Sequence, residues 1–203
     1  MKFKNLKYYL DEYRSKSTLD VIGPLFEGGK IFNDPVIYVD GGSRFRGPQQ
    51  EGFSVGDGDS TNIALDESLN TKKNYSDLSY VLSHLSENFN RINLHGFLGG
   101  RRDHELMNLA EIHTFLKAKK QTKLQLDKTV IALSCGQWEE EYHGSFSVFC
   151  FEKSDAVISG DVKYRTDSKG LSKLSSHGLS NQATGNIKVS CVQPVFLFFN
   201  PST

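Results

Sequence analysis

The chain has 203 residues, of which 37% are hydrophobic and 24% charged, the composition of an ordinary globular protein. At this length folding buries about 70% of the unfolded chain's surface, so a core can form without disulfides or structural metals. The 24 Lys and Arg residues balance 24 Asp and Glu residues, and a formal net charge of zero lacks the basic excess of a dedicated nucleic-acid binder or of a protein held to membranes by charge.

Signals for targeting and for disulfide bonds are weak in this sequence. No apolar run approaches the roughly 18 to 20 residues of a membrane span, and residues 1–13 are too polar for the apolar core of a signal peptide. Cys135, Cys150 and Cys191 lie far apart in strand-like stretches, so we expect reduced core thiols rather than a disulfide or a metal site. These observations predict a cytoplasmic protein with no nucleic-acid or membrane partner.

The first part of the chain alternates between strand and helix patterns. Apolar positions at helical spacing predict helices at 2–15, at 103–119, and from Asp77 onward, where Ser76 is the candidate N-cap. Strands are predicted at 18–26, 35–39, 53–55 and 91–97. This order favours a mainly parallel sheet with helices on its faces, an α/β (Rossmann-like) domain over residues 1–125.

The pattern changes in the second part of the chain. Strands without a convincing helix between them are predicted at 129–135, 145–151, 155–159, 186–192 and 195–200. We place the boundary in the polar stretch 121–127 and expect an all-β sandwich domain over residues 126–203. Trp138 and the acidic run 139–141 are predicted to form a solvated loop, or alternatively the rim of a dimer contact or a pocket.

Four loops that follow strands or precede helices carry the residues suited to chemistry. They are 40–42 (Asp-Gly-Gly), 56–60 (Gly-Asp-Gly-Asp-Ser), 76–77 (Ser-Asp) and 99–104 (Gly-Gly-Arg-Arg-Asp-His). Ligands of open α/β sheets bind beyond the carboxyl ends of the strands, and carboxylates that converge there need a cation to offset their charge. Oxygen ligands of this kind suit Mg²⁺, and glycines with Arg101 suit phosphate oxygens. Together the loops predict phosphoryl-type transfer from a nucleotide.

Other motifs are absent or incomplete. The sequence contains neither a GxxxxGK[ST] loop nor a GxGxxG fingerprint. The stretch from His104 to Asn108 begins like the zinc helix HExxH but ends in Asn, which argues against a zinc peptidase. A single Asp-Gly step is most often a plain turn, so only the four loops together support a site.

The loops, in this order, resemble the thiamin pyrophosphokinase family. The family pattern is DGG, then GDxDS, a TD-type step that opens a helix, GGRxDHxLxN, and a Ser-Asn pair in the β region. This chain has Asp40-Gly41-Gly42, Gly56-Asp57-Gly58-Asp59-Ser60, Ser76-Asp77, Gly99-Gly100-Arg101-Arg102-Asp103-His104-Glu105-Leu106-Met107-Asn108 and Gly178-Leu179-Ser180-Asn181. The similarity spans about residues 35–200, and GGRxDHxLxN is its most specific part.

The resemblance implies an enzyme, a thiamine diphosphokinase that transfers pyrophosphate from ATP to the thiamin hydroxyl and releases AMP. It implies ATP as co-substrate, Mg²⁺ as cofactor, and a homodimer whose thiamin pocket lies between the α/β domain of one chain and the β domain of the other. Carried over by position, the catalytic residues are Asp57, Asp59, Asp77, Arg101 and Asp103, of which Asp57, Asp59 and Asp77 bind the metal. The implied contacts to ATP and its phosphates are Asp40, Gly41, Gly42, Ser60, Gly99, Gly100, Arg101, His104 and Asn108. Those to thiamin are Tyr164, Ser180 and Asn181, where an aromatic face suits the cationic thiazolium.

The chain departs from the family pattern at several positions, and these departures leave more than one function open. Acidic residues are usual where this chain has Asn74 and Ser79, and Arg44 stands where Asn is common. The differences favour, as an alternative, a pyrophosphokinase of the same fold that acts on another hydroxymethyl heterocycle such as a pterin. A second possibility is a nucleotide- or thiamin-binding homologue without turnover, and a third is an interaction protein whose loops are plain turns. Either Asp77 or Asp103 is the candidate proton acceptor.

Overall fold

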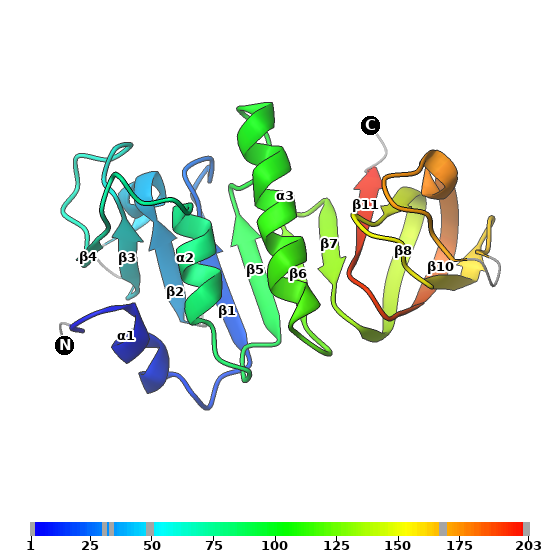
Figure 1. Cartoon of the computed structure of the whole chain (residues 1–203), viewed down its shortest axis with the longest axis horizontal. Helices are drawn as coiled ribbons and strands as arrows, with labels where there is room; N and C mark the ends of the chain where they lie inside the picture. The colour runs from blue at the N-terminus through cyan, green and yellow to red at the C-terminus, as the bar shows by residue number, and fades with distance from the viewer. Residues whose placement is uncertain (1–2, 30–31, 33–34, 48–50, 167–169, 201–203) are drawn as a thin grey trace. The chain divides into compact units, whose positions relative to one another are not determined.

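The chain is a mixed α/β protein with a large sheet and few helices (Figure 1). The computed structural model describes residues 3–29, 32, 35–47, 51–166 and 170–200. Its elements are α1 (Leu6–Glu12), β1 (Thr18–Ile22), β2 (Val36–Val39), η1 (Asp40–Phe45), β3 (Phe53–Gly56), β4 (Glu67–Ser68), α2 (Asp77–His84), β5 (Arg91–His95), α3 (Arg102–Lys117), β6 (Lys123–Leu126), β7 (Val130–Leu133), β8 (Gly136–Phe149), β9 (Val157–Val162), η2 (Ser176–Gly178), β10 (Asn181–Cys191) and β11 (Val195–Asn200), where η denotes a 3₁₀ helix.

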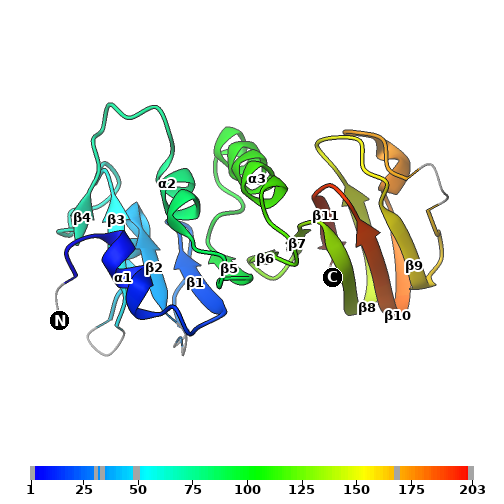
Figure 2. The ribbon, with the colours of Figure 1, turned by 60° about the horizontal axis from the view of Figure 1, so that its bottom comes forward.

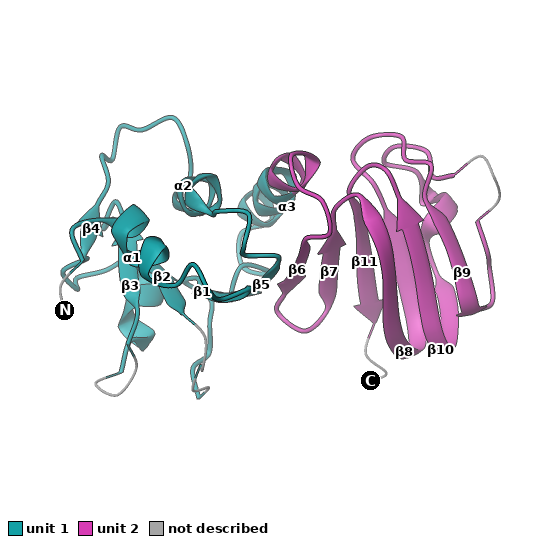
Figure 3. Ribbon diagram, turned by 90° about the horizontal axis from the view of Figure 1, so that it is seen from below, with its two compact units in different colours: residues 1–112 teal, residues 113–203 magenta. Residues whose placement is uncertain are grey.

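Two compact units divide the chain, residues 1–112 and residues 113–203 (Figure 3). The division falls within α3, ahead of the polar stretch where the sequence pattern changes. The assignment of separate nucleotide and acceptor domains to 1–125 and 126–203 stays a prediction. Each unit is described below by itself.

The first unit contains a parallel sheet in the order β4-β3-β2-β1-β5. All four residues of β2 are buried, which is typical of a strand covered on both faces. The alternation of strands and helices predicts the parallel pairing, whereas β4 has no such signal, because two residues carry no periodicity. Parallel strands of one sheet bring their carboxyl ends to a common edge, so the loops after β2 and β3 are neighbours there (Figure 1).

Side-chain caps start two helices of this unit: α2 begins after Ser76 as predicted, whereas α1 begins at Leu6, inside the predicted helix 2–15. The side chain of Asn5 accepts a hydrogen bond from the Tyr8 amide at the start of α1, and Ser76 accepts one from the Ser79 amide at the start of α2. Lys2, the first residue of the predicted helix, lies outside the described residues. Figures 1 and 2 show α1 near the ends where β2 and β3 begin.

Glu67 of β4 joins α1 to α2. One oxygen of its carboxylate accepts a hydrogen bond from the Leu6 amide at 2.7 Å, and the other accepts one from the Tyr80 hydroxyl at 2.7 Å. The amide of Leu6 lies in the first turn of α1, where backbone N–H groups lack helical partners. A strand of two residues therefore fixes the start of one helix and a side chain of the other.

The second unit contains an antiparallel sheet in the order β6-β7-β11-β8-β10-β9. Its core includes Phe146, Ile187 and Leu197, all fully buried. Cys150 and Cys191 lie in the same core, as predicted, whereas Cys135 is half-buried; all three are free thiols. Hydrogen bonding places these strands in one sheet. The segment 170–180 lies against the end of β8: the Ser180 amide donates to Ser147 Oγ, and the Leu174 amide donates to the carbonyl of Cys150, the residue after β8.

Two sequence predictions are wrong in this unit. Trp138 and the acidic run after it belong to β8 and are not a loop, and Lys123 begins β6 inside the stretch taken as a linker. Glu140 points inward with its side chain only 13% exposed because both of its oxygens lie 2.7 Å from the Lys123 ammonium. An inward carboxylate breaks the apolar alternation by which a strand is recognised, and its cation comes from another strand.

Within the described residues no helix is both long and apolar enough to cross a membrane.

Candidate active site

Three carboxylates meet beyond the ends of β2 and β3 in the first unit. One oxygen each from Asp40, Asp57 and Asp59 lies within 4.8 Å of the other two. Asp40 is buried, Asp57 half-buried and Asp59 exposed, so the group faces outward from the sheet edge. The structure thus brings together two of the three predicted metal ligands with Asp40, a predicted ATP contact.

Local backbone geometry explains how Asp40 reaches this place. The φ angle of Asp40 is +44°, a left-handed conformation that Asp adopts more readily than most non-glycine residues. A Cβ on Gly56 would lie 2.8 Å from the Asp40 Cβ, and a Cβ on Gly42 would lie 2.2 Å from the Ile22 carbonyl oxygen. Both positions require glycine, because the turn after β2 packs directly against β1 and β3.

Hydrogen bonds hold the Asp40 carboxylate. Its Oδ1 accepts from the Gly58 amide at 3.1 Å, and its Oδ2 accepts from the Ser60 hydroxyl. Gly41 packs against the same hydroxyl, since a Cβ there would lie 2.9 Å from Ser60 Oγ. Gly41 and Ser60, which the sequence predicts as phosphate contacts, therefore hold the Asp40 carboxylate in place in this structure.

The donor set fits a Mg²⁺ ion. Carboxylate oxygens are the hard ligands that Mg²⁺ prefers, and two oxygens on opposite sides of the ion at 2.0–2.1 Å are about 4.2 Å apart. Small side-chain rotations would bring oxygens within 4.8 Å of one another into one such shell. Partial desolvation and the nearby Asp57 and Asp40 charges raise the pKa of the Asp59 carboxyl, and a bound cation would offset this repulsion.

Lys73, which sequence reasoning missed, lies among these acids. Its ammonium donates to Asp57 Oδ2 and lies 3.1 Å from Asp77 Oδ1, an ion pair without hydrogen-bond alignment. The Lys73 side chain is only 7% exposed. Although burial opposes it, bonding to the two carboxylates raises the pKa of Lys73. Lys73 precedes α2 in a segment without regular structure, so no periodicity in the sequence predicts its direction.

The two carboxylates that share Lys73 respond differently to it. The hydrogen bond from Lys73 lowers the pKa of Asp57. Burial raises the pKa of Asp77, and Lys73 offsets only part of that rise. Asp77 is also the first residue of α2, directly after Ser76, whose hydroxyl donates to Glu111 of α3 at 2.5 Å. Asp77 therefore joins the site through Lys73 and does not belong to the group of three.

The GGRxDHxLxN segment follows β5 and starts α3. Arg101 and Asp103 form a two-pronged pair, with Nε to Oδ1 at 3.2 Å and Nη2 to Oδ2 at 2.6 Å, and this pairing lowers the pKa of Asp103 to about 2. Both side chains are exposed, at 71% and 63%. His104 is exposed, and the Asn108 side-chain amide donates to the Phe97 carbonyl at 2.9 Å. Arg101 thus bonds the Asp103 carboxylate, and Asn108 ties the start of the loop after β5 to α3.

The two glycines of this segment have open, left-handed backbones. The φ angles of Gly99 and Gly100 are +87° and +67°, and both residues are exposed. The Gly99 amide donates to the Glu105 carboxylate at 2.9 Å. Because the Gly99 amide already donates to a carboxylate near the start of α3, it is oriented to bind an anion such as a phosphate oxygen. In contrast, Gly41 and Gly42 are buried.

The three predicted thiamin contacts lie together in the second unit. Tyr164 is 56% exposed, whereas Asn181 is 7% exposed and bonds the Tyr164 backbone at both its amide (2.9 Å) and its carbonyl (2.6 Å). The Asn181 Oδ1 also accepts from the Gln182 amide at 2.8 Å. Ser180 has a φ of +58°, and its amide donates to Ser147 Oγ at 3.1 Å. Asn181 therefore positions Tyr164, which itself faces solvent.

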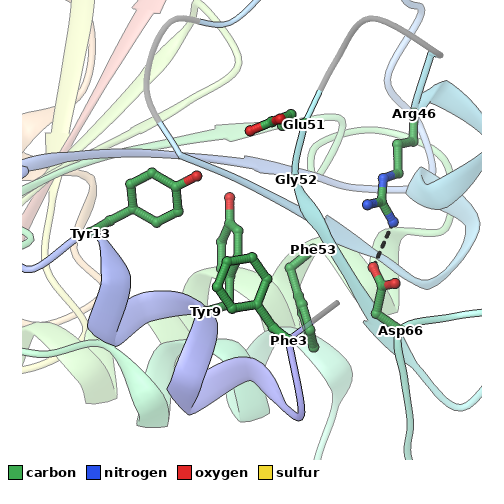
Figure 4. A pocket seen from close by; sticks show the side chains of 8 residues that line it. All are labelled: Phe3, Tyr9, Tyr13, Arg46, Glu51, Gly52, Phe53 and Asp66. Carbon is green, nitrogen blue, oxygen red and sulfur yellow. Dashed lines mark hydrogen bonds and ion pairs between the residues drawn. The ribbon is translucent and has the colours of Figure 1, made fainter. Parts of the chain in front are cut away.

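A small cavity accompanies this region, and a larger one lies elsewhere. A space of about 80 Å³ is lined by Tyr164, Asn181 and His177, among others. A cavity of about 450 Å³ in the first unit lies between α1 and β3 (Figure 4). Tyr13, Phe53 and the Arg46–Asp66 ion pair line it, and none of its lining residues is a predicted site residue. Cavity size alone would therefore have placed the candidate site at α1 and not at the three carboxylates.

Several solved structures share the fold of this chain. Thiamine pyrophosphokinase from Bacillus subtilis has a TM-score of 0.70 at 19% identity, covering 91% of this chain and 100% of that one. Thiamin pyrophosphokinase from Geobacillus thermodenitrificans gives 0.65 at 16% identity, covering 92% and 99%. That from Candida albicans gives 0.65 at 12% identity, covering 93% and 89%. No family model and no curated protein sequence matches the chain. The resemblance seen in the motifs is thus confirmed at the level of the fold, and the chain has the fold of the thiamin pyrophosphokinases.

Proposed function

We propose that the protein is a thiamin pyrophosphokinase, which transfers the pyrophosphoryl group of ATP to the thiamin hydroxyl and releases AMP. The proposal includes the layout that the motifs imply: an ATP- and Mg²⁺-binding α/β domain at 1–125, a thiamin-binding β-sandwich at 126–203, and an active site completed by a second copy of the chain.

The observation that carries the proposal is the group of Asp40, Asp57 and Asp59, placed by the DGG and GDxDS loops at adjacent strand ends of a fold shared with thiamin pyrophosphokinases. Plain turns would not require three carboxylates to converge, because their mutual repulsion is unfavourable. The convergence makes sense where a cation and a polyphosphate bind.

The chain's own residues would act mainly by orienting and neutralising charge, as phosphoryl transfer demands. Asp40, Asp57 and Asp59 would hold Mg²⁺, which when bound offsets charge on the phosphate oxygens. Lys73 and Arg101 are two cations that would be available to the transferred group. Asp77 fits the role of proton acceptor better than Asp103, because burial raises the Asp77 pKa whereas Arg101 lowers the pKa of Asp103.

The decisive experiment is to measure AMP release by the purified protein with Mg-ATP, with and without thiamin, and to identify the product by mass spectrometry. Thiamin-dependent AMP together with thiamin diphosphate supports the proposal. AMP that appears only with a pterin or another hydroxymethyl heterocycle would move the proposal to that acceptor. Absence of AMP with every acceptor would refute catalysis.

Asp57→Asn and Asp59→Asn test the site directly. Each variant is expected to lower turnover by at least about a hundredfold, the scale for loss of a group that stabilises transition-state charge, while the chain stays folded. Asp11→Asn is the matched control, because Asp11 lies on α1 and forms an exposed ion pair with Arg14. Wild-type turnover in either site variant would contradict the metal assignment.

A further inference from the structure

Lys73 is a buried ammonium with two carboxylate partners and no role assigned by the motifs. We infer that Lys73 serves as a built-in cation of the nucleotide-free site, so that the acidic residues bind a free divalent ion only weakly and the metal enters with the nucleotide. This inference rests on the proposed function for the identity of the nucleotide, but the behaviour of Lys73 toward metal alone can be tested separately.

The contacts of Asp57 carry the argument. Its Oδ1 accepts from the Asp59 amide at 3.3 Å, and its Oδ2 accepts from the Lys73 ammonium, so both oxygens have donors. The side chains of Lys73, Asp57 and Asp77 are 7%, 13% and 15% exposed, and water therefore screens these charges weakly. Asp57 is also one of the three carboxylates whose oxygens converge.

A divalent ion that binds Asp57 must come close to the Lys73 ammonium or displace it. Two positive centres on one half-buried carboxylate repel each other, and the repulsion grows as solvent is excluded. Lys73 thus competes with free metal for Asp57. It also prevents repulsion between Asp57 and Asp77 while no metal is bound, because one ammonium lies against both.

A nucleotide changes this balance, because its phosphates give Lys73 a new partner. Lysine acts as a compact charge on a flexible stem, so its ammonium can exchange a carboxylate oxygen for a phosphate oxygen without a change in the backbone. Asp57 is then available to the metal that the phosphates carry. The geometry therefore couples metal binding to nucleotide binding through a single side chain.

Lys73→Gln tests this coupling by measuring the binding of Mn²⁺ alone, without nucleotide, by electron paramagnetic resonance. We expect the dissociation constant for Mn²⁺ to fall by about tenfold or more in Lys73→Gln, because a like charge is removed from the site. Lys73→Arg, which keeps the charge, and Lys72→Gln, which removes an exposed charge from the adjacent residue, should both bind Mn²⁺ as the wild type does. An Mn²⁺ affinity of Lys73→Gln within twofold of the wild type would overturn the inference.

Removing Lys73 also leaves Asp57 and Asp77 without a cation beside them, which can prevent folding in the absence of metal. The pair Asp77→Asn and Lys73→Gln/Asp77→Asn lessens this problem, since the double variant loses one charge of each sign and leaves only Asp57 without its cation. Tighter Mn²⁺ binding by the double variant than by Asp77→Asn supports the inference, and equal binding refutes it. Melting of the wild type with Mg-ATP separates the two proposals: no rise in Tm would count against the proposed function, while the Mn²⁺ comparison still decides the role of Lys73.

Discussion

Asn181 is expected to contribute most of its stabilisation through the Tyr164 backbone. Three hydrogen bonds join its amide to the Tyr164 amide, the Tyr164 carbonyl and the Gln182 amide, and the side chain is 7% exposed. A net contribution of about 1 kcal/mol per hydrogen bond gives about 3 kcal/mol for Asn181→Ala, with the backbone groups of Tyr164 left without their partner. For a chain of this size each kcal/mol lowers Tm by about 2 to 4 °C, so we expect a loss of about 6 to 12 °C.

Thermal unfolding followed by circular dichroism measures this change. Asn186→Ala on the same strand is the control, since Asn186 makes an exposed side-chain bond to Glu139, and it should cost less than about 1 kcal/mol. A Tm loss below about 2 °C for Asn181→Ala would refute the view that the amide holds Tyr164 in place. If the proposed function holds, Asn181→Ala should also raise KM for the acceptor more than it lowers kcat, because Tyr164 moves and the carboxylates do not.

Two further predictions concern the other loops. Gly42→Ala should destabilise the chain by at least about 2 kcal/mol, because the new Cβ would lie 2.2 Å from the Ile22 carbonyl oxygen. Gly47→Ala is the control and should change Tm little, because no atom lies within 4 Å of the position of its Cβ. Equal Tm values for the two variants would contradict the close packing of the turn after β2. The carboxyl of Asp103 should titrate near pH 2 in the wild type and return toward 3.8 in Arg101→Ala, as measured by NMR. Since the folded pKa is the lower one, this pair favours the folded state fully above about pH 4 and ceases to do so as the pH falls through 2.

The sequence predicts elements whose periodicity or capping is local. The start of α2 at Ser76 and the parallel strands around β2 follow from patterns that short-range sterics and burial impose. Prediction fails where a distant residue compensates for an unfavourable one. Glu140 lies on the inward face of β8, where the Lys123 ammonium, 17 residues away in the sequence, neutralises its charge. An acidic residue at an inward position interrupts the apolar alternation, so the sequence pattern predicts a loop.

The same distinction explains which parts of the candidate site could be predicted. Asp40 and Asp57 each follow a strand directly, so their meeting at one sheet edge follows from parallel pairing. The role of Asn181 as the support of Tyr164 could not be predicted, because it depends on hydrogen bonds from its side chain to the backbone of a residue 17 positions away. Lys73 was missed because the segment before α2 has no regular geometry from which a side-chain direction can be derived.

The ion pairs of the candidate site affect how a nucleotide can bind there. Arg101 bonds Asp103, and Lys73 bonds Asp57, so both of these cations already have a carboxylate partner. A polyphosphate must therefore exchange partners with these carboxylates. At the exposed Arg101–Asp103 pair this exchange costs little free energy, since surface ion pairs contribute about 0 to 1 kcal/mol. At Lys73 the exchange exposes a half-buried carboxylate, which is favourable only if a metal arrives at the same time. Mg-ATP, which supplies both charges, should therefore bind more tightly than ATP in the presence of a chelator.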